Sequence, residues 1–286
     1  MSGNPDRDQE PEFTGHEWDG IRECNNPLPR WWLWTLYATI AWGVGYMVAY
    51  PALPLIERAT PGILGYSTRA ELAEDLEVAS AANAPLDDRL VATNLNEIAS
   101  LTDLREYAIR GGAAVFRNYC SQCHGSGAGG AFGYPNLLDD DWIWGGDIEA
   151  IHFSVSHGIR DDGDADSRYS EMPAFTELIE SDEIDNVTEF VLKLSNQDHD
   201  PKMAGLGATV FEEQCSICHG EEGRGDREQG SPNVADAIWI YGGDRETVRQ
   251  TIANGRFTVM PSWRERLTES QIRQVSVYVH QLGGGE

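Results

Sequence analysis

The chain carries one pentapeptide twice, as Cys120-Ser-Gln-Cys123-His124 and as Cys215-Ser-Ile-Cys218-His219. C-x-x-C-H is the attachment signature of c-type haem, since two thiols at this spacing can bond the two vinyl groups of one porphyrin. The histidine that follows then lies beneath the ring and can ligate the iron. The two motifs therefore predict two covalently bound haem c groups, attached through Cys120, Cys123, Cys215 and Cys218, with His124 and His219 as axial ligands.

The sequence on either side of the pentapeptides is also duplicated. GAAVF at 112–116 recurs as GATVF at 207–211, and WIWGGD at 142–147 recurs as WIYGGD at 239–244. Each copy closes with apolar residues at helical spacing, which is typical of an amphipathic helix. The offset between the copies changes only from motif to motif, as expected when duplicated domains differ in their loops.

This duplication predicts an all-α protein with two tandem domains of the class I cytochrome c type, at 105–195 and 205–286, joined by a polar linker at 196–204. The first helix of each domain is expected to cross the closing helix of the same domain at a glycine, Gly112 or Gly207. At these crossings Phe116 is expected to pack on Phe190, and Phe211 on Tyr278. Domains this small have thin cores, so a buried haem would supply much of their apolar contact.

Each iron needs a second axial ligand. Of the five methionines, only Met172 and Met260 recur in the duplication, each at the head of an M-P-[A/S]-[F/W] motif. A thioether opposite a histidine gives the six-coordinate iron of electron-transfer cytochromes and raises its potential relative to bis-histidine ligation. We therefore predict Met172 and Met260 as ligands, assuming that each serves the haem of its own repeat. Two alternatives remain: both methionines are ordinary core residues, or His157 replaces the methionine in the first domain.

Two further residue pairs are candidates for the surroundings of the haems. A carbonyl near Pro135 or Pro232 could accept the Nδ1–H of the ligating histidine and so fix its tautomer. The indole N–H groups of Trp142 and Trp239 could donate to haem propionates, or the two rings could simply form walls of the pocket.

Other chemistry fits the cysteines and acids less well. A zinc site would need a fourth ligand, and no H-x₃₋₅-H follows either motif. A thioredoxin-like pair would need a βαβ context, which the sequence does not show. The acidic stretch 161–171 is an insert that the second repeat lacks. Asp162, Asp164 and Asp166 resemble the start of a calcium loop, but the required Gly and Glu positions are occupied by Ser167 and Pro173, which favours a solvated or partner-facing loop.

A transmembrane helix is predicted at 31–56, which contains no charged residue. Pro51 and Pro54 should end the regular helix, leaving about 20 residues, sufficient for a hydrocarbon core of ~30 Å. Tryptophans at its start and Tyr46 and Tyr50 near its end are typical of interfacial belts. Some 30 polar residues precede the segment, so a cleaved signal peptide fits poorly. Residues 57–104 should form a helical connector, with helices near 67–81 and 87–101.

The chain is strongly acidic. Its 47 acidic and 21 basic residues give a net charge of −26, which excludes nucleic acid as a partner. A mean hydropathy of −0.42 excludes a polytopic membrane protein. Residues 57–286 contain 40 of the acids and 18 of the bases, a net charge of −22. This charge could be a docking field for a basic cytochrome or an adaptation to a saline habitat.

The stretch Thr14-Gly-His-Glu-Trp-Asp-Gly-Ile21, followed by Asn26-Pro-Leu-Pro-Arg-Trp-Trp32, carries a family resemblance. Together with the haem motifs and the closing Y-V-H-Q-L-G-G-G, it resembles the dihaem cytochrome c subunit (subunit III) of bacterial cbb(3)-type cytochrome c oxidases. The insert at 161–171 is a departure from that pattern. The resemblance implies the same thioether cysteines and His–Met ligands that the motifs predict, and an electron-relay subunit that has no catalytic residues of its own.

The resemblance also implies location and partners. Residues 1–30 would be cytoplasmic, the span would lie in the bacterial inner membrane, and both haem domains would be periplasmic. Electrons would arrive from a soluble or membrane c-type cytochrome and leave through a monohaem cytochrome c subunit to the catalytic subunit, which holds haem b and copper. Two other functions remain open: electron transfer from a periplasmic dehydrogenase, and a dihaem peroxidase with one open iron position.

Overall fold

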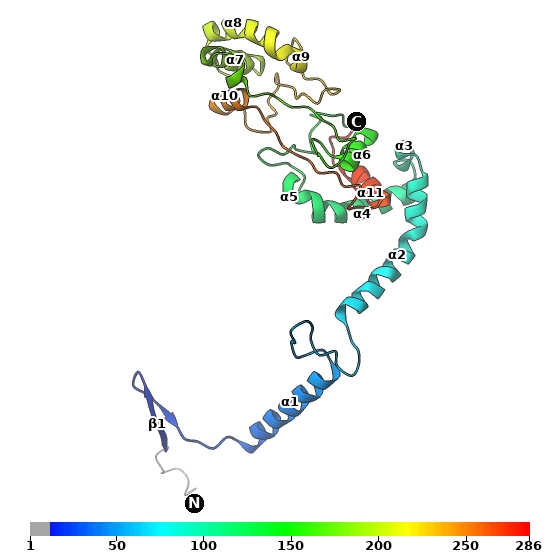
Figure 1. Ribbon diagram of the computed structural model, residues 1–286, viewed down its shortest axis with the longest axis vertical. Helices are drawn as coiled ribbons and strands as arrows, with labels where there is room; N and C mark the ends of the chain where they lie inside the picture. Colours follow the sequence, from blue (N-terminus) through cyan, green and yellow to red (C-terminus); the bar gives the residue numbers. More distant parts are fainter. Residues whose placement is uncertain (1–11) are drawn as a thin grey trace, which may run out of the picture. The chain divides into compact units, whose positions relative to one another are not determined.

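The computed structural model describes residues 12–286 (Figure 1). Of the N-terminal segment predicted at 1–30, residues 1–11 therefore lie outside the description. The chain divides into two compact units, an N-terminal unit that ends at Ala81 and a C-terminal unit from Ala82 to Glu286. Both predicted haem domains fall in the C-terminal unit.

The N-terminal unit begins with a β-hairpin that the all-α prediction did not include. Strand β1 (Phe13–Trp18) pairs antiparallel with β2 (Ile21–Cys24), and Trp18 lies opposite Ile21. Asp19 and Gly20 connect the strands with φ values of +47° and +84°. An Asp-Gly pair suits this turn because a two-residue hairpin loop of type I′ needs a positive φ at both central residues.

Helix α1 (Arg30–Ala49) occupies most of the uncharged segment 31–56. It ends just before Pro51, as the sequence predicts, because proline cannot continue a helix. No residue of α1 is buried within the chain. Among residues 12–286, none of the helices combines the length and the apolar character that a membrane crossing requires. The expected span is thus present as a helix, and its insertion in a membrane stays a prediction.

The connector is more continuous than expected. Instead of two separate helices, α2 (Thr68–Ala92) runs through Pro85, and only the short α3 (Leu95–Ile98) follows it. Leu90 and Ile98 are completely buried, in a cluster with Leu104 and Ala108 of the next helix. The end of the connector is therefore part of the packed C-terminal unit.

The C-terminal unit is helical, and its helices follow the duplication. The first repeat contains α4 (Thr102–Val115), α5 (Ser121–His124), α6 (Ile148–His157) and α7 (Ser181–Leu194). The second contains α8 (Pro201–Val210), α9 (Ser216–His219), α10 (Arg245–Asn254) and α11 (Glu269–His280). The repeated WIxGGD motif has a structural role here, since its aspartates Asp147 and Asp244 cap the N-termini of α6 and α10.

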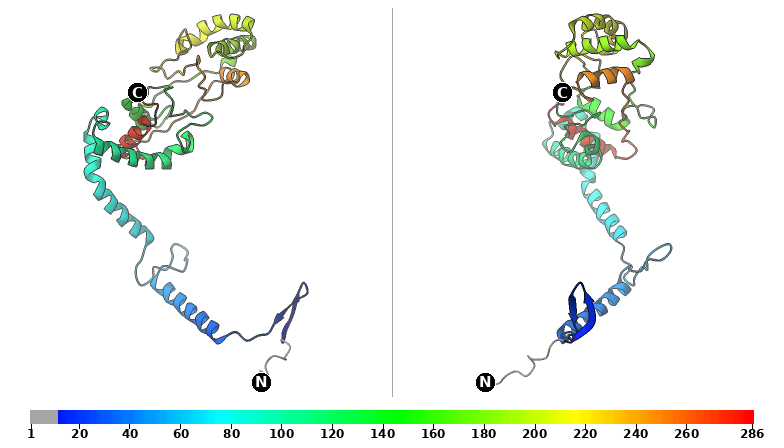
Figure 2. Two further views of the ribbon diagram at one scale, coloured as in Figure 1. Left: turned by 180° about the vertical axis from the view of Figure 1, so that it is seen from behind. Right: turned by 90° about the vertical axis from the view of Figure 1, so that its left-hand side faces the viewer.

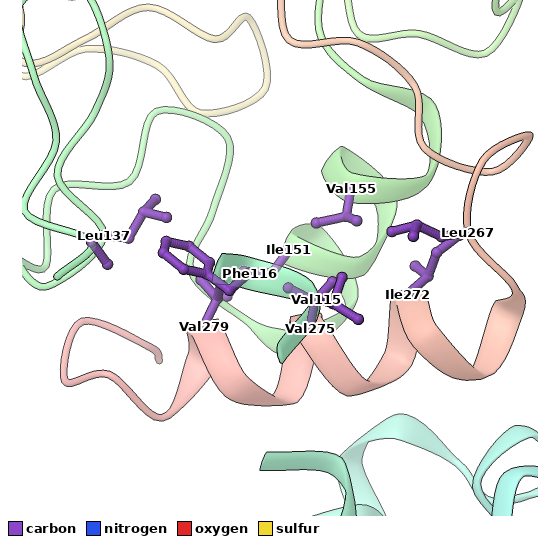
Figure 3. Packing of buried hydrophobic residues seen from close by; sticks show 10 residues of the cluster. Val115, Phe116, Leu137, Ile151, Val155, Leu267, Ile272, Val275 and Val279 are labelled. Carbon is purple, nitrogen blue, oxygen red and sulfur yellow. The ribbon is translucent and has the colours of Figure 1, made fainter. Parts of the chain in front are cut away.

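The closing helices are exchanged between the repeats (Figures 1 and 2). Helix α11, at the end of the second repeat, packs on α4 of the first, whereas α7 of the first repeat packs on α8 of the second. A first core forms between α4, α6 and α11, where Figure 3 shows Phe116 close to Val279 and Val115 close to Val275. A second core forms between α7, α8 and α10, around Phe211, Val187 and Val248.

The predicted aromatic pairs are consequently wrong in their partners. Phe116 packs on Tyr278 with ring centroids 5.5 Å apart, and Phe190 packs on Phe211 at 5.2 Å. The reason lies in the connection between α7 and α8, which comprises only residues 195–200. Helices joined by so short a loop pack against each other. Because α7 packs on α8, α11 is the closing helix that packs on α4.

The two predicted glycine crossings are real, although with the exchanged partners. A Cβ atom on Gly112 would lie 2.1 Å from the carbonyl oxygen of Gln274 on α11. A Cβ atom on Gly207 would lie 2.0 Å from the carbonyl oxygen of Asn186 on α7. Neither position has room for any side chain, so glycine is required at both.

Candidate haem sites

Each C-x-x-C-H motif begins in a widened helical turn. The π-helical turns Phe116–Cys120 and Phe211–Cys215 continue α4 and α8, and the remainder of each motif forms α5 or α9. Such turns are rare and often occur at functional sites. Here they redirect the chain so that the last cysteine and the histidine of each motif border the same cavity as the first cysteine.

Both motif histidines are oriented for iron through one ring nitrogen. The Nδ1 atom of His124 lies 3.2 Å from the carbonyl oxygen of Pro135, and that of His219 lies 2.9 Å from the carbonyl oxygen of Pro232. A carbonyl accepts only from N–H, so Nδ1 carries the hydrogen and Nε2 carries the lone pair that a metal needs. Burial lowers the pKa of both histidines, which favours this neutral form. The predicted proline carbonyl contacts are confirmed.

The four motif cysteines are free of disulfides. Burial raises the pKa of the Cys120 and Cys215 thiols to about 11. Within residues 12–286, neither motif belongs to a group of three or more His, Cys, Asp or Glu side chains whose ligand atoms lie close enough to hold one metal ion. The zinc alternative therefore gains no support.

All eight predicted site residues line one continuous cavity of about 520 Å³. Its wall is mainly apolar and includes residues of both cores, such as Phe116, Val275, Phe211 and Val187. The hydroxyl of Ser231 also borders it and is buried without a hydrogen-bond partner in the described part of the chain. An apolar cavity with aimed imidazoles and one unpaired hydroxyl fits a porphyrin, whose faces are apolar and whose propionates are polar.

Each predicted methionine ligand packs on the core that contains the first helix of the other repeat. Met260 packs on the first core, as does Cys120, and Met172 packs on the second core, as does Cys215. Two backbone hydrogen bonds pair Met260 with Ile159, which lies two residues after the end of α6, with N···O distances of 2.8 and 3.0 Å. The assumption that each methionine serves the haem of its own repeat therefore lacks support in the packing.

Two glycines allow the methionine segments to approach the opposite repeat closely. Gly158 has a φ of +72°, and a Cβ atom there would lie 2.3 Å from the carbonyl oxygen of Met260. Gly255 has a φ of +68°, and a Cβ atom there would lie 2.3 Å from the carbonyl oxygen of Met172. A side chain at either position would push the methionine segment away, besides straining the backbone.

His157, the alternative ligand, lies outside the residues that line the cavity. Its Nδ1 atom is 3.2 Å from both carboxylate oxygens of Asp164, a residue of the insert. Asp166 completes a group of three side chains that could approach a cation, but His157 and Asp164 already satisfy each other. The calcium hypothesis gains no support, because Asp161 and Asp164 accept hydrogen bonds from Ser262 of the Met260 motif instead.

The indole of Trp142 does not face a propionate with its N–H group, since it donates to the carbonyl oxygen of Gly284. Both Trp142 and Trp239 line the cavity. For Trp142 the interpretation as an aromatic wall is thus the correct one.

Arg160 is a cavity residue that the sequence motifs did not reveal. It donates to two backbone carbonyls, those of Thr258 and Ser170, at 2.7 and 2.9 Å. Comparison of the repeats could not find it, because its counterpart is Phe257. The available signal was a single arginine directly before the insert.

The sequence matches two families of known proteins. "N-terminal domain of cytochrome oxidase-cbb3, FixP" matches residues 10–57, and "Cytochrome C oxidase, cbb3-type, subunit III" matches residues 108–191 and 203–279. The chain is 56% identical over 290 residues to a cbb3-type cytochrome c oxidase subunit CcoP of Cereibacter sphaeroides, covering all of both chains. It is 51% identical to subunit CcoP of Rhodobacter capsulatus, again over the full length of both, and 48% identical to subunit FixPc of Rhizobium leguminosarum bv. viciae over 96% of both.

The chain belongs to the cbb3-type cytochrome c oxidase subunit III family. The resemblance predicted from the sequence is confirmed. Its cofactor is covalently bound haem c, for which the chain has two attachment motifs. Its partners include other subunits of the oxidase, and the C-terminal unit consists of cytochrome c domains.

Proposed function

We propose that this chain is the electron-relay subunit of a cbb3-type oxidase, in which electrons pass between two haem c groups on their way to the oxygen-reducing subunit. The observation that carries the proposal is the single cavity shared by both C-x-x-C-H motifs and both predicted methionine ligands. Because the two cores meet at this cavity, both cofactors would be held by one rigid set of helices.

We further propose that the axial ligands are crossed. His124 and Met260 would hold the haem attached to Cys120 and Cys123, since Met260 packs on the first core. His219 and Met172 would hold the haem attached to Cys215 and Cys218, since Met172 packs on the second. Each iron would then be held by ligands from both repeats, so that neither haem site is complete without the exchange.

The chain's own residues favour electron transfer over bond chemistry. Proline carbonyls fix each histidine with its Nε2 lone pair available, and each glycine corner at Gly158 or Gly255 holds a methionine segment close to the opposite repeat. The wall of the cavity consists mainly of aromatic and aliphatic side chains. With both axial positions filled at both sites, the arrangement leaves no open position for oxygen or peroxide.

The uncharged segment 31–56 would anchor the subunit in the bacterial inner membrane. The support is that α1 carries exposed tryptophans along its length, with Trp31, Trp34 and Trp42 each at least 70% exposed within the chain. Aromatic residues are enriched at membrane interfaces. Residues 1–30 would then be cytoplasmic and the haem-bearing repeats 105–195 and 205–286 periplasmic, where a c-type cytochrome could reach them.

The partners would be the catalytic subunit with haem b and copper, a monohaem cytochrome c subunit, and a soluble or membrane c-type cytochrome as donor. Purification of the tagged full-length chain from its host membrane tests this assembly. We expect it to bring down an oxygen-reducing core that contains haem b and copper. Recovery with a periplasmic dehydrogenase in place of that core would refute the proposal.

Spectra of the haem-loaded chain test the relay. Two low-spin haems that do not bind carbon monoxide are expected, whereas a high-spin ferric haem would favour a peroxidase. The crossing can be tested in chains that retain one attachment motif. With Cys215→Ala and Cys218→Ala, the remaining haem should lose its methionine signature in Met260→Ala and keep it in Met172→Ala. The opposite result would restore ligation within each repeat.

A further inference from the structure

Arg160 connects the two segments that carry the predicted methionine ligands. Its Nε donates to the carbonyl of Thr258, two residues before Met260, at 2.7 Å. Its Nη1 donates to the carbonyl of Ser170, two residues before Met172, at 2.9 Å. One guanidinium thus binds the equivalent carbonyl in both methionine segments, although these segments lie 88 residues apart in the sequence.

The surroundings fix this guanidinium in place. Arg160 is half-buried and lines the cavity, and its Cζ lies 5.7 Å from the ring centroid of Phe257. Its neighbour Ile159 forms the two backbone hydrogen bonds to Met260. The planar fork of arginine can donate in several fixed directions at once, which a lysine ammonium on a flexible stem cannot do in the same geometry.

The backbone of Arg160 is unusual as well. Its φ is +56°, one of four positive values among non-glycine residues of the described chain. A residue with a Cβ atom adopts this region only when its surroundings enforce it, and such positions cluster at functional sites. The counterpart Phe257 does not share this conformation. The arrangement therefore belongs to Arg160 itself and not to the repeated fold.

We propose that Arg160 is a positioning residue for both methionine ligands: by holding the two segments to each other, it fixes the sulfur–iron geometry at both haems. This inference rests on the proposed methionine ligation, but not on which methionine serves which haem. Its distinctive consequence is that one substitution should disturb two haems.

The test uses the full-length chain with both haems attached, in the variants Arg160→Gln and Arg160→Lys. Arg168→Gln is the matched control, because Arg168 is also half-buried, lies in the neighbouring insert and donates to one backbone carbonyl, that of Trp144. The readouts are the methionine-to-iron charge-transfer absorption of the ferric state, carbon monoxide binding in the ferrous state, and the two reduction potentials. Haem content and helicity identify a variant that has failed to assemble.

In Arg160→Gln we expect the charge-transfer absorption to fall by more than half, which requires a loss at both haems, and both potentials to decrease. Arg160→Lys should show the same loss although it keeps the charge, and Arg168→Gln should retain the native signal. If Arg160→Gln does not retain haem, the lysine variant decides.

Three results would overturn the proposal. A native absorption in Arg160→Gln would mean that the contacts do not position the ligands. A loss confined to one haem would mean that Arg160 serves only one segment. Native behaviour of Arg160→Lys would mean that only its charge matters. Absence of the methionine absorption in the wild type would instead overturn the proposed axial ligation, on which this inference rests. Survival of that absorption in Arg160→Gln would overturn only the role of Arg160.

Discussion

Gly205 and Gly207 lie two positions apart in α8 and differ in what surrounds them. A Cβ atom on Gly205 would meet nothing within 4 Å, whereas one on Gly207 would lie 2.0 Å from the carbonyl oxygen of Asn186. The first glycine only weakens the helix, while the second permits α7 and α8 to touch. The sequence identified Gly207 through its recurrence, but it could not name the helix that it contacts.

This difference gives a paired prediction. Gly207→Ala should lower the free energy of unfolding by about 1–3 kcal/mol, because the helices must separate to admit the methyl group. Gly205→Ala should raise it by about 0.5–1 kcal/mol, since alanine favours the helix at an open position. Thermal or denaturant unfolding of the two variants, followed by circular dichroism, checks both signs. Equal effects would contradict the crossing at Gly207.

At the scale of the elements, Glu189 on α7 joins three helices. Its side chain is only 7% exposed, and it accepts from Arg245 at the start of α10 with an Nε···Oε1 distance of 2.5 Å. Its other oxygen accepts from the backbone N–H of Asp200, which caps α8, at 2.6 Å. The Arg245 guanidinium beside Glu189 holds the pKa of that carboxyl below its usual value.

A carboxyl whose pKa is lowered by folding stabilises the folded state while it is ionised. That contribution should be complete above the ordinary glutamate pKa of about 4.3 and be lost as the pH falls through the lower folded value. We expect Glu189→Gln to cost about 1–3 kcal/mol of unfolding free energy at pH 7. The difference from the wild type should shrink as the pH falls below about 4.3.

The control for this prediction is Asp185→Asn. Asp185 also joins α7 to α10, through Arg249, but its side chain is 41% exposed. An exposed pair contributes only about 0–1 kcal/mol. Urea titrations across the acid range compare the two variants. A pH-independent difference between Glu189→Gln and the wild type would contradict the role given to the ionised carboxyl.

The exchange of closing helices predicts where core mutations act. Val275 on α11 and Val187 on α7 are both completely buried, in the first and second core respectively. Val275→Ala should therefore loosen α4, and Val187→Ala should loosen α8, each by about 1–3 kcal/mol. Amide hydrogen exchange of the haem-loaded chain measures this helix by helix. If each substitution instead loosened the first helix of its own repeat, the packing of α11 on α4 and of α7 on α8 would be wrong.

At the scale of the whole molecule, the negative charge is unequally divided between the two haem motifs. Residues 116–133, around the first motif, contain no acid and one arginine. The equivalent residues 211–228 contain six acids and two arginines. Ile217, between the two cysteines of the second motif, is 78% exposed. If a basic cytochrome is the donor, as proposed, this exposed apolar residue within an acidic surface makes the second motif the expected place of its arrival.

The donor prediction concerns rate rather than stability. Reduction of the chain by a basic cytochrome c should slow as ionic strength rises, because salt screens the attraction. Replacing Glu212 and Glu213 with glutamine should slow it several-fold at low salt, whereas the same change at Glu74 and Glu77, in the N-terminal unit, should not. Stopped-flow reduction measures both effects. A flat salt profile would favour adaptation to a saline habitat instead.

The sequence by itself determined the chemistry and the family. The spacing of Cys, Cys and His suffices for haem attachment, and recurrence distinguished two methionines from the other three. It also placed the first and closing helices of each repeat, because apolar periodicity and glycine positions act locally along the chain. In the connector it predicted two helices where α2 is continuous through Pro85. The hairpin at residues 13–24 was not predicted, although its Asp-Gly turn was a readable signal.

Only the tertiary structure decided which equivalent parts meet. Because the two repeats are similar, either closing helix could pack on either first helix, and periodicity is the same in both arrangements. The short connection between α7 and α8 selects one arrangement, and the packing then carries each methionine segment to the opposite core. Arg160 could not be found by comparing repeats, since its role depends on two segments that are brought together only by folding.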